Sequence, residues 1–300
     1  MNETTSAVAA APAAPALSMS TPEQGAARRV GISTITFRFR PLHEALALIA
    51  ATGAVEVDLG AIPAVTDHVP VPFTGDAQAY LAALARHGLR AGAVNADVGP
   101  LNDPALGQAA LTATVRPLVA LAAATGGALI VPCGGPSWQA YVDEEVDLDR
   151  TVANLRLISR LCAQQGVRLL VEVLHHRRWV HDVARADRVL QALGPQEIGL
   201  LLDTSHVVAS GDDVVAWAAR QVHRVERVHL RDAVPGDLNL GIGRGRVDFR
   251  GVLTALEAGG FSGTYVLELE THDIAEEERE ADAQRSFDEV VALLAEVAPG

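Results

Sequence analysis

One pattern repeats along most of this chain: a short apolar run, a polar or glycine- and proline-containing loop, and a longer alanine- and leucine-rich segment of helical periodicity. The apolar runs are expected to form strands at residues 30–34, 54–59, 89–94, 128–132, 167–172, 198–203, 225–230 and 264–268. The segments that follow are expected to form helices at residues 42–52, 76–87, 104–125, 149–165, 183–193, 212–222, 249–258 and about 275–297. Eight strand–helix units predict a single (β/α)8 TIM barrel.

A doubly wound open sheet is the main alternative for a chain that alternates strands and helices. Such sheets commonly contain about five or six strands and often carry a glycine-rich phosphate-binding turn after the first one. Residues 31–40 contain no GxGxxG sequence. The number of units and the missing turn therefore favour the barrel.

Residues 1–28 differ from the repeating part, because they are rich in alanine, proline, serine and threonine. They lack the basic start and the uninterrupted apolar stretch of a secretory signal. We therefore expect a disordered tail over residues 1–28 and one barrel domain over residues 29–300. Neither part contains an apolar stretch long enough to span a membrane, so no membrane association is expected.

The charge balance and the amino acid usage exclude several functions. The 37 acidic residues outnumber the 24 basic ones, and the net charge of −13 disfavours a nucleic-acid partner. The chain contains no lysine, which excludes Schiff-base aldolases, pyridoxal phosphate enzymes and P-loop NTPases. Cys133 and Cys162 are isolated, so neither disulfides nor a cysteine zinc site is expected, and the expected location is the reducing cytoplasm.

Four polar side chains end apolar runs in the second half of the chain: Glu172, Asp203, His229 and Glu268. A charge at the end of a buried parallel strand is unfavourable unless it is paired. The carboxyl ends of barrel strands lie together, at the end where active sites of this fold are found. Three carboxylates and one imidazole suit a divalent cation such as Mn²⁺, Mg²⁺ or Co²⁺.

Each of these residues also has a structural interpretation. Glu172 is compatible with an ion pair at the barrel rim, Asp203 with a helix N-cap, and His229 with a hydrogen-bonded core histidine. Glu270 competes with Glu268, because strand alternation places both on the same side. The presence of three carboxylates and an imidazole at equivalent positions favours a shared cation site.

Five short motifs stand in the second half of the chain, and four of them contain these residues. They read Glu172-Val-Leu-His175, Asp203-Thr-Ser-His206, His229-Leu-Arg-Asp232, Gly241-Ile-Gly-Arg-Gly-Arg246 and Tyr-Val-Leu-Glu268. The motifs resemble the sugar phosphate isomerase/epimerase group of the xylose isomerase-like TIM barrels, a superfamily that also contains ketose 3-epimerases, inosose dehydratases and endonuclease IV. The resemblance extends from about Val30 to the C-terminus. It implies that Glu172, Asp203, His229 and Glu268 bind one divalent metal and that the two glutamates move protons on opposite faces of a sugar carbon.

The resemblance implies a divalent-metal-dependent isomerase or epimerase of a sugar or sugar phosphate. A cation bound to a carbonyl and a neighbouring hydroxyl stabilises an enediolate, while a carboxylate takes the proton next to the carbonyl. Mn²⁺ is the expected cation, with Mg²⁺, Co²⁺ and Zn²⁺ as alternatives. A lyase that dehydrates an inosose or keto-sugar is the main alternative function, and an inactive sugar-binding barrel is a third. We expect a small-molecule carbohydrate substrate, and the sequence leaves a homo-oligomer open.

Further residues are expected around the substrate: Glu56, His175, His206, Asp232 and Arg246. His175 and His206 each follow a metal-ligand candidate by three residues, and Arg246 lies in a glycine-rich loop that can fold over the barrel mouth. Asp232 is also compatible with orienting His229, and Glu56 or Asp58 with a salt bridge at the rim. The side chains expected to line the pocket are Asn95, Asp97, Cys133 and Trp138.

Two departures separate the chain from other members of the superfamily. Xylose isomerase itself relies on a lysine and a second metal site, whereas this chain has no lysine and reads HxxD from His229 to Asp232. Endonuclease IV needs additional histidines at the early strand ends, where this chain has Asn95 and Cys133. Cleavage of DNA at abasic sites is therefore not expected.

Overall fold

The computed structural model describes residues 21–298 and contains a closed barrel of eight parallel strands. The barrel strands are β1 (Val30–Ser33), β2 (Glu56–Ala61), β3 (Arg90–Ala96), β4 (Ala128–Pro132), β5 (Leu169–Glu172), β6 (Gly199–Asp203), β7 (Val225–Leu230) and β10 (Thr264–Leu267). They close in the order β1-β10-β7-β6-β5-β4-β3-β2. The predicted TIM barrel is therefore confirmed.

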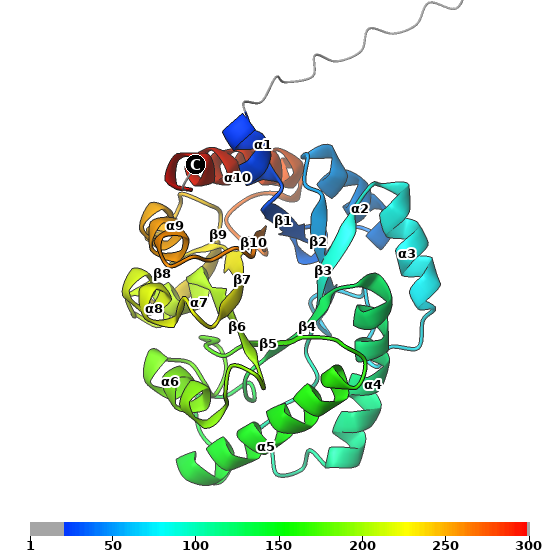
Figure 1. Ribbon diagram of the computed structural model, residues 1–300, viewed down its shortest axis with the longest axis vertical. Coiled ribbons are helices and arrows are strands. Elements are labelled where there is room, and N and C mark those ends of the chain that lie inside the picture. Colours follow the sequence, from blue (N-terminus) through cyan, green and yellow to red (C-terminus); the bar gives the residue numbers. More distant parts are fainter. Residues whose placement is uncertain (1–20, 299–300) are drawn as a thin grey trace, which may run out of the picture.

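Helices surround the ring of strands and cover its outer face (Figure 1). The longer helices are α2 (Leu42–Ala51), α3 (Ala77–Arg86), α4 (Gln108–Thr125), α5 (Glu144–Ala163), α6 (Val183–Ala192), α8 (Val214–Gln221), α9 (Phe249–Ala258) and α10 (Arg279–Val297). The shorter ones are η1 (Thr34–Phe37), α7 (Thr204–Ala209) and η2 (Glu276–Glu278). Outward-facing strand residues such as Val57, Val94 and Val228 are fully buried in the core that these helices cover. Within residues 21–298, no helix combines the length and the apolar character needed to cross a membrane.

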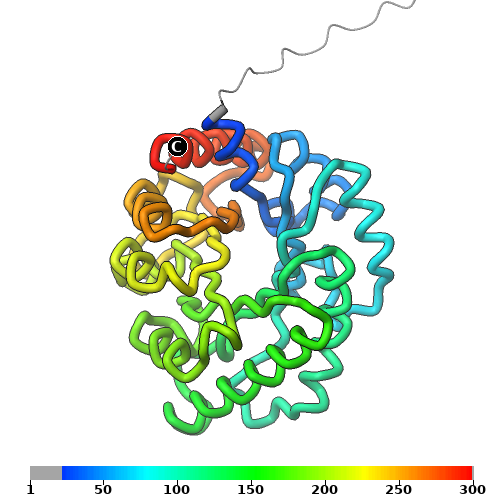
Figure 2. The backbone as a smooth tube through the Cα atoms, in the orientation of Figure 1, coloured from blue at the N-terminus to red at the C-terminus, as the bar shows by residue number. Residues whose placement is uncertain are grey.

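The first helix, α1 (Thr21–Ala27), packs against α10 at one edge of the barrel, as Figures 1 and 2 show. Its residue Ala26 is buried in the main core. The predicted tail covers residues 1–28; residues 1–20 lie outside the described part of the chain, and residues 21–27 are helical. The folded part of the chain therefore begins before the predicted boundary at residue 29.

The inside of the barrel has an apolar half and an ionic half. On β3 to β6, the inward-facing side chains form a separate apolar cluster of Ala93, Ile130, Leu170 and Leu201. On β2 and β7, strand alternation directs polar side chains inward, namely Glu56, Asp58, Arg227 and His229, and all four are buried. Gly92 on β3 accommodates the ionic half, because a Cβ there would overlap the side chains of Arg227 and Glu56.

Two elements at the carboxyl end of the barrel differ from the predicted pattern. The strands β8 (Asp232–Val234) and β9 (Asp237–Leu240) form an antiparallel hairpin directly after β7, and α7 directly follows β6. Asn239 in the hairpin has φ 73°, a left-handed conformation that asparagine adopts more readily than most residues. Because both elements begin where strands end, they border the site that the strand ends form.

Candidate metal centre

The four predicted metal ligands lie on or directly after consecutive strands of the ring and form what we call the ligand set: Glu172, Asp203, His229 and Glu268. Glu172 and Asp203 are the last residues of β5 and β6, and Glu268 directly follows β10. Potential ligand atoms of Glu172, Asp203 and His229 all lie within 4.8 Å of one another. Oε2 of Glu268 is 3.3 Å from Nδ1 of His229. The structure therefore brings all four side chains together.

The ligand set is buried, so water does little to screen the repulsion between its carboxylates. Glu172 and Glu268 are each 5% exposed and Asp203 is 2% exposed. Burial and the nearby carboxylates of Asp203 and Glu268 raise the pKa of Glu172 to about 8. A divalent cation among these oxygens would offset their repulsion, so the residues present fit such a cation.

His229 presents its two ring nitrogens to different partners. Nε2 lies 2.9 Å from Oδ2 of Asp58, whereas Nδ1 faces Glu268 in a geometry that makes no hydrogen bond. Burial opposes the charged imidazole, but the carboxylates of Glu268 and Asp58 raise the pKa of His229 to about 10. A histidine must be neutral to bind a metal, so a cation at Nδ1 would replace a proton there. The geometry of Nδ1 therefore fits a cation ligand.

Asp203 and Glu268 have lowered pKa values despite their burial. Burial alone would raise the pKa of Asp203, but Arg231 and His229 lower it; for Glu268, His229 and Arg231 outweigh burial in the same way. Oδ1 of Asp203 also accepts hydrogen bonds from the backbone N–H and the hydroxyl of Ser205. Both carboxylates are therefore ionised at neutral pH.

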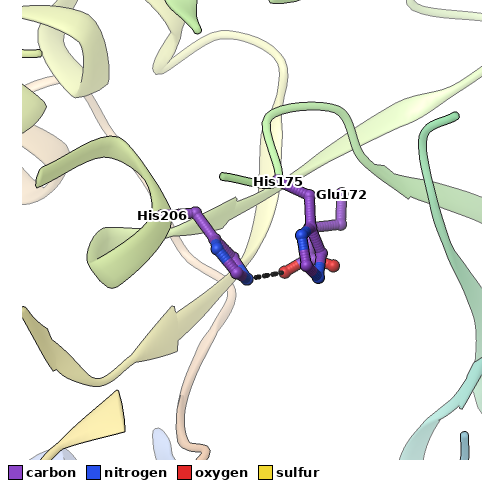
Figure 3. A group of neighbouring side chains, drawn as sticks. All are labelled: Glu172, His175 and His206. Carbon is purple, nitrogen blue, oxygen red and sulfur yellow. Dashed lines mark ion pairs between the residues drawn. The ribbon is translucent and has the colours of Figure 1, made fainter. Parts of the chain in front are cut away.

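Two histidines form a second group around Glu172 (Figure 3). His175 and His206 stack with ring centroids 3.8 Å apart, and Nε2 of His206 is 3.4 Å from Oε1 of Glu172. The ligand atoms of these three residues also lie within 4.8 Å of one another. However, Nδ1 of His206 accepts the backbone N–H of His176, and Nδ1 of His175 accepts that of Arg177. A neutral imidazole that accepts at Nδ1 carries its proton on Nε2, so His175 offers an N–H donor there rather than a metal ligand. Nε2 of His206 lies 3.2 Å from Nη2 of Arg231, which can only donate, so neither tautomer of His206 satisfies all its contacts.

Burial also determines the charge of His175 and His206. Burial lowers the pKa of both His175 and His206 well below the usual histidine range, and Arg231 adds to the effect on His206. Both rings are therefore neutral at pH 7. They lie beside the ligand set as uncharged imidazoles.

Arg231 places a guanidinium inside the negative cluster. Its Nη2 is 2.8 Å from Oδ2 of Asp203 and 3.7 Å from Oε2 of Glu268, and its Nη1 is 3.2 Å from Oε2 of Glu270. Burial alone would lower its pKa, but these carboxylates raise it. Glu270, the predicted competitor of Glu268, thus pairs with Arg231, while Glu268 contacts His229.

A cavity of about 250 Å³ adjoins the ligand set. Its polar lining includes Glu172, Glu268, His175, His206, Arg231, Asn95, Asp97, Arg177, Arg178, Asn239 and Glu270. Asn95 and Asp97 thus line the cavity, as expected from the sequence, whereas Cys133 and Trp138 do not. Cys133 is fully buried, and burial raises the pKa of its thiol to about 12. Trp138 is 51% exposed and stacks on His181.

Three predicted substrate-binding residues lie away from this cavity. Glu56 is the first residue of β2 rather than near its end, and its carboxylate pairs with Arg90 and Arg227. Asp232 accepts hydrogen bonds from the backbone amides of residues 233, 245 and 247, so it holds the loop that follows the hairpin instead of orienting His229. Arg246 is exposed and lines a separate hollow with Asp212 and Pro235.

Several cavity residues carry no strong signal in the sequence. Arg231 shares a strand face with His229, since the two are two residues apart, and this alternation is the one clue to its position. Arg178, whose Nη2 is 2.5 Å from Oδ2 of Asp97, belongs to the loop after β5, for which the sequence predicts no conformation. Asn239 reaches the cavity only because of the hairpin.

The family that the sequence matches has the TIM barrel fold found in the structure. The sequence of residues 46–291 matches the family described as xylose isomerase-like TIM barrel. An inosose dehydratase of Geobacillus thermodenitrificans is 29% identical over 150 residues, covering 43% of this chain and 49% of that protein. The rhizopine catabolism protein MocC of Rhizobium meliloti is 31% identical over 155 residues, covering 45% of this chain and 44% of that protein. The chain thus spans about half the length of these curated relatives.

Solved structures share the fold over most of the chain at low sequence identity. The IOLI protein with a bound zinc atom matches with a TM-score of 0.72 and 18% identity, covering 88% of this chain and 98% of that one. The structure of L-ribulose 3-epimerase matches with a TM-score of 0.71 and 19% identity, covering 90% and 95%. These likenesses show a common fold. Because the family match covers most of the barrel, the chain belongs to the xylose isomerase-like TIM barrel family.

Proposed function

We propose that this protein is a divalent-metal-dependent enzyme that removes a proton next to the carbonyl of a small polyhydroxylated substrate, as a sugar epimerase or isomerase does. The observation that carries the proposal is the buried ligand set beside a cavity of about 250 Å³. A protein that only binds a sugar needs no buried group of three carboxylates. The proposed substrate is a carbohydrate or a cyclitol ketone.

The proposed cofactor is one divalent cation held by the ligand set, with Mn²⁺ as the first choice for carboxylate and imidazole donors. When bound, it would polarise a carbonyl oxygen and a neighbouring hydroxyl of the substrate and so acidify the proton on the carbon beside the carbonyl. The IOLI protein, which shares the fold, was solved with a zinc atom, and this supports a divalent cation here.

Glu172 and Glu268 are the proposed proton carriers because they reach the cavity from two sides. They lie on β5 and directly after β10, and β6 and β7 separate these strands in the ring. Both carboxylates line the cavity. A substrate carbon held between them has one carboxylate on each face, so one can remove a proton and the other can return it on the opposite face. Asn95 donates to Oε1 of Glu268 at 3.1 Å and holds that carboxylate in place.

The remaining cavity groups support a substrate with several hydroxyls. The Oδ1 atoms of Asn95 and Asn239 are buried without a hydrogen-bond partner, and both side chains line the cavity. Substrate hydroxyls would donate to these oxygens and remove the cost of leaving them unpaired. The Nε2–H group of His175 adds a donor for substrate oxygens.

A lyase that dehydrates an inosose or a keto-sugar is the second candidate. Two observations favour it: the matched relatives include an inosose dehydratase, and Nε2 of His206 lies 3.4 Å from Glu172. In a dehydration, the carboxylate removes the proton beside the carbonyl, and a protonated group must donate to the departing hydroxide. The carboxylate that has taken up the proton is then such a group, so it can deliver that proton to the hydroxide, water leaves, and the carboxylate is regenerated.

Deuterium exchange tests the proposal without knowledge of the product. Metal-free protein would be reloaded with Mn²⁺ and incubated in D₂O with a panel of keto-sugars and inososes, and ¹H NMR would follow the proton next to the carbonyl. Exchange with inversion indicates an epimerase, exchange with a shifted carbonyl an isomerase, and loss of water a lyase. The absence of exchange across the panel by Mn²⁺-saturated protein would contradict proton abstraction.

The variants Glu172→Gln and Glu268→Gln identify the groups that move the proton. The amide is nearly isosteric, so the fold should persist, but turnover should fall by roughly 10²- to 10⁴-fold. Rates must be compared at saturating Mn²⁺, because an amide is a poorer ligand. Exchange that survives in one variant and disappears in the other shows which glutamate removes the proton. If both variants turn over at wild-type rates, the two-glutamate mechanism is wrong.

A further inference from the structure

We propose that Asp58 is the positioning residue of the cation site: it fixes the proton of His229 on Nε2 so that the lone pair of Nδ1 faces the ligand set. The inference rests on the proposed cation site, but it concerns a residue of β2 outside the ligand set. It predicts which nitrogen of His229 binds the cation and which lumen carboxylate controls its affinity.

The contact between Asp58 and His229 crosses the inside of the barrel. Asp58 lies on β2 and His229 on β7, with β1 and β10 between these strands in the ring. Both side chains are fully buried, with no exposed surface, and Oδ2 of Asp58 is 2.9 Å from Nε2 of His229. The imidazole is therefore held from the lumen side, and its other nitrogen can only face Glu268 and the remaining ligands.

Arg227 keeps Asp58 in a state that can only accept hydrogen bonds. Its Nε donates to Oδ2 of Asp58 at 2.8 Å, and its Nη2 is 2.7 Å from Oδ1. A carboxylate with a guanidinium on both oxygens is ionised and has no proton to donate. Nε2 of His229 must therefore be the donor in its contact with Asp58. A neutral imidazole with its proton on Nε2 has its lone pair on Nδ1.

The position of Arg227 is fixed from the opposite side by Glu56. Nη2 of Arg227 donates to Oε1 of Glu56 at 2.7 Å, and Nε of Arg90 donates to Oε2 of Glu56 at 2.9 Å. Gly92 provides the room for this arrangement. Glu56 is thus a second carboxylate partner of Arg227 that does not contact His229, and it supplies a matched control.

The opposing explanation is that Asp58 only neutralises Arg227. In that case the variants Asp58→Asn and Glu56→Gln should act alike, because each removes one carboxylate charge from the same guanidinium. A positioning role predicts different results. An amide at position 58 can donate as well as accept, so it no longer determines which nitrogen of His229 carries the proton.

Cation affinity provides the first measurement. Mn²⁺ would be titrated by calorimetry into metal-free wild type, Asp58→Asn and Glu56→Gln, each first shown to be folded by circular dichroism. We expect Asp58→Asn to bind roughly 10- to 100-fold more weakly, as is typical when the carboxylate behind a metal-binding histidine is lost. Glu56→Gln should stay within about twofold of wild type, because it leaves the His229 contact intact. Equal losses in both variants, or no loss in Asp58→Asn, would overturn the proposal.

The tautomer of His229 gives a second measurement that needs no variant at position 58. Wild-type protein labelled with ¹⁵N-histidine and loaded with ¹¹³Cd²⁺ should show a cadmium coupling to Nδ1 of His229 and a proton on Nε2; a His229→Asn sample assigns the signal. A coupling to Nε2 would refute the proposal even if Asp58→Asn fails to fold. If wild type binds neither Mn²⁺ nor Cd²⁺, the proposed function fails as well, whereas binding that is insensitive to Asp58 overturns the positioning role alone.

Discussion

Raising the pH should destabilise this protein when no divalent cation is bound. Burial with Asp203 and Glu268 raises the pKa of Glu172 from its ordinary value of 4.5 to about 8. A carboxyl group whose pKa is raised by folding stabilises the folded state fully below pH 4.5, and this contribution is lost as the pH rises through 8. His229 acts in the same direction, because its pKa rises from 6.5 to about 10.

The loss in the free energy of unfolding can be calculated from the difference between the starting pH, 6, and the pKa of Glu172. One pKa unit corresponds to about 1.4 kcal/mol, and pH 6 lies about two units below that pKa. Between pH 6 and pH 9, Glu172 alone should therefore lower the free energy of unfolding by about 3 kcal/mol. That loss is large beside the roughly 5–15 kcal/mol by which folded domains are stable.

Urea unfolding at pH 6, 7, 8 and 9 in the presence of a chelator measures this loss. Mn²⁺ at one hundred times its dissociation constant should restore about 2.7 kcal/mol. The metal-free variant Glu172→Gln should lose clearly less stability over the same range, because its side chain does not ionise. If metal-free wild type keeps the same stability from pH 6 to pH 9, or if the variant shows the full wild-type loss, the electrostatic account of the ligand set is wrong.

Other outcomes can be measured with single variants or a simple assay. Gly92→Ala should lower the free energy of unfolding in urea by about 2–3 kcal/mol, because the new methyl group overlaps Arg227 and Glu56 in the packed lumen. Asn95→Asp should slow proton exchange of an active panel substrate roughly tenfold, since a carboxylate at this position cannot donate the hydrogen bond that holds the carboxylate of Glu268 in place. Mn²⁺-loaded protein should not nick a duplex with an abasic site on a denaturing gel, because its net charge is −13.

The barrel and the convergence of Glu172, Asp203, His229 and Glu268 could be predicted because both depend on local patterns. Strand and helix periodicity repeats eight times, and the sequence places β4 and β7 with the same bounds as the structure. Glu172 and Asp203 end their strands, so their location needs no knowledge of loops. Barrel topology then brings the strand ends together.

Glu56 shows why register along a strand is harder to predict than its existence. The sequence Val-Glu56-Val-Asp58 directs both acids to the lumen, whichever residue begins the strand. The strand is predicted over residues 54–59 but begins two residues later, so Glu56 lies at the amino end of β2 instead of further along it. In the structure β2 begins at Glu56, so this carboxylate pairs with Arg90 and Arg227, and Asp58 reaches His229.

Loop residues were harder to place because their positions depend on contacts far apart in the sequence. Asp232 and Arg246 are expected over the cavity, but β8 and β9 fold into a hairpin, and Asp232 holds the loop that follows it. The hairpin places Asn239 at the cavity and leaves Arg246 exposed beside Asp212. No short-range pattern distinguishes these arrangements.

The ionic half of the lumen is better explained by its role in orienting the imidazole of His229 than by a contribution to the stability of the barrel. Buried ion pairs often contribute less than well-packed apolar side chains of similar volume, and the opposite half of this lumen is filled by Ala93, Ile130, Leu170 and Leu201. An apolar layer on β2 and β7 would therefore be expected to stabilise the barrel at least as well. It would not hold the imidazole of His229, whereas Asp58 and Arg227 contact each other directly and Asp58 contacts that ring. The polar side chains inside the barrel thus fix the orientation of His229 at the candidate metal centre.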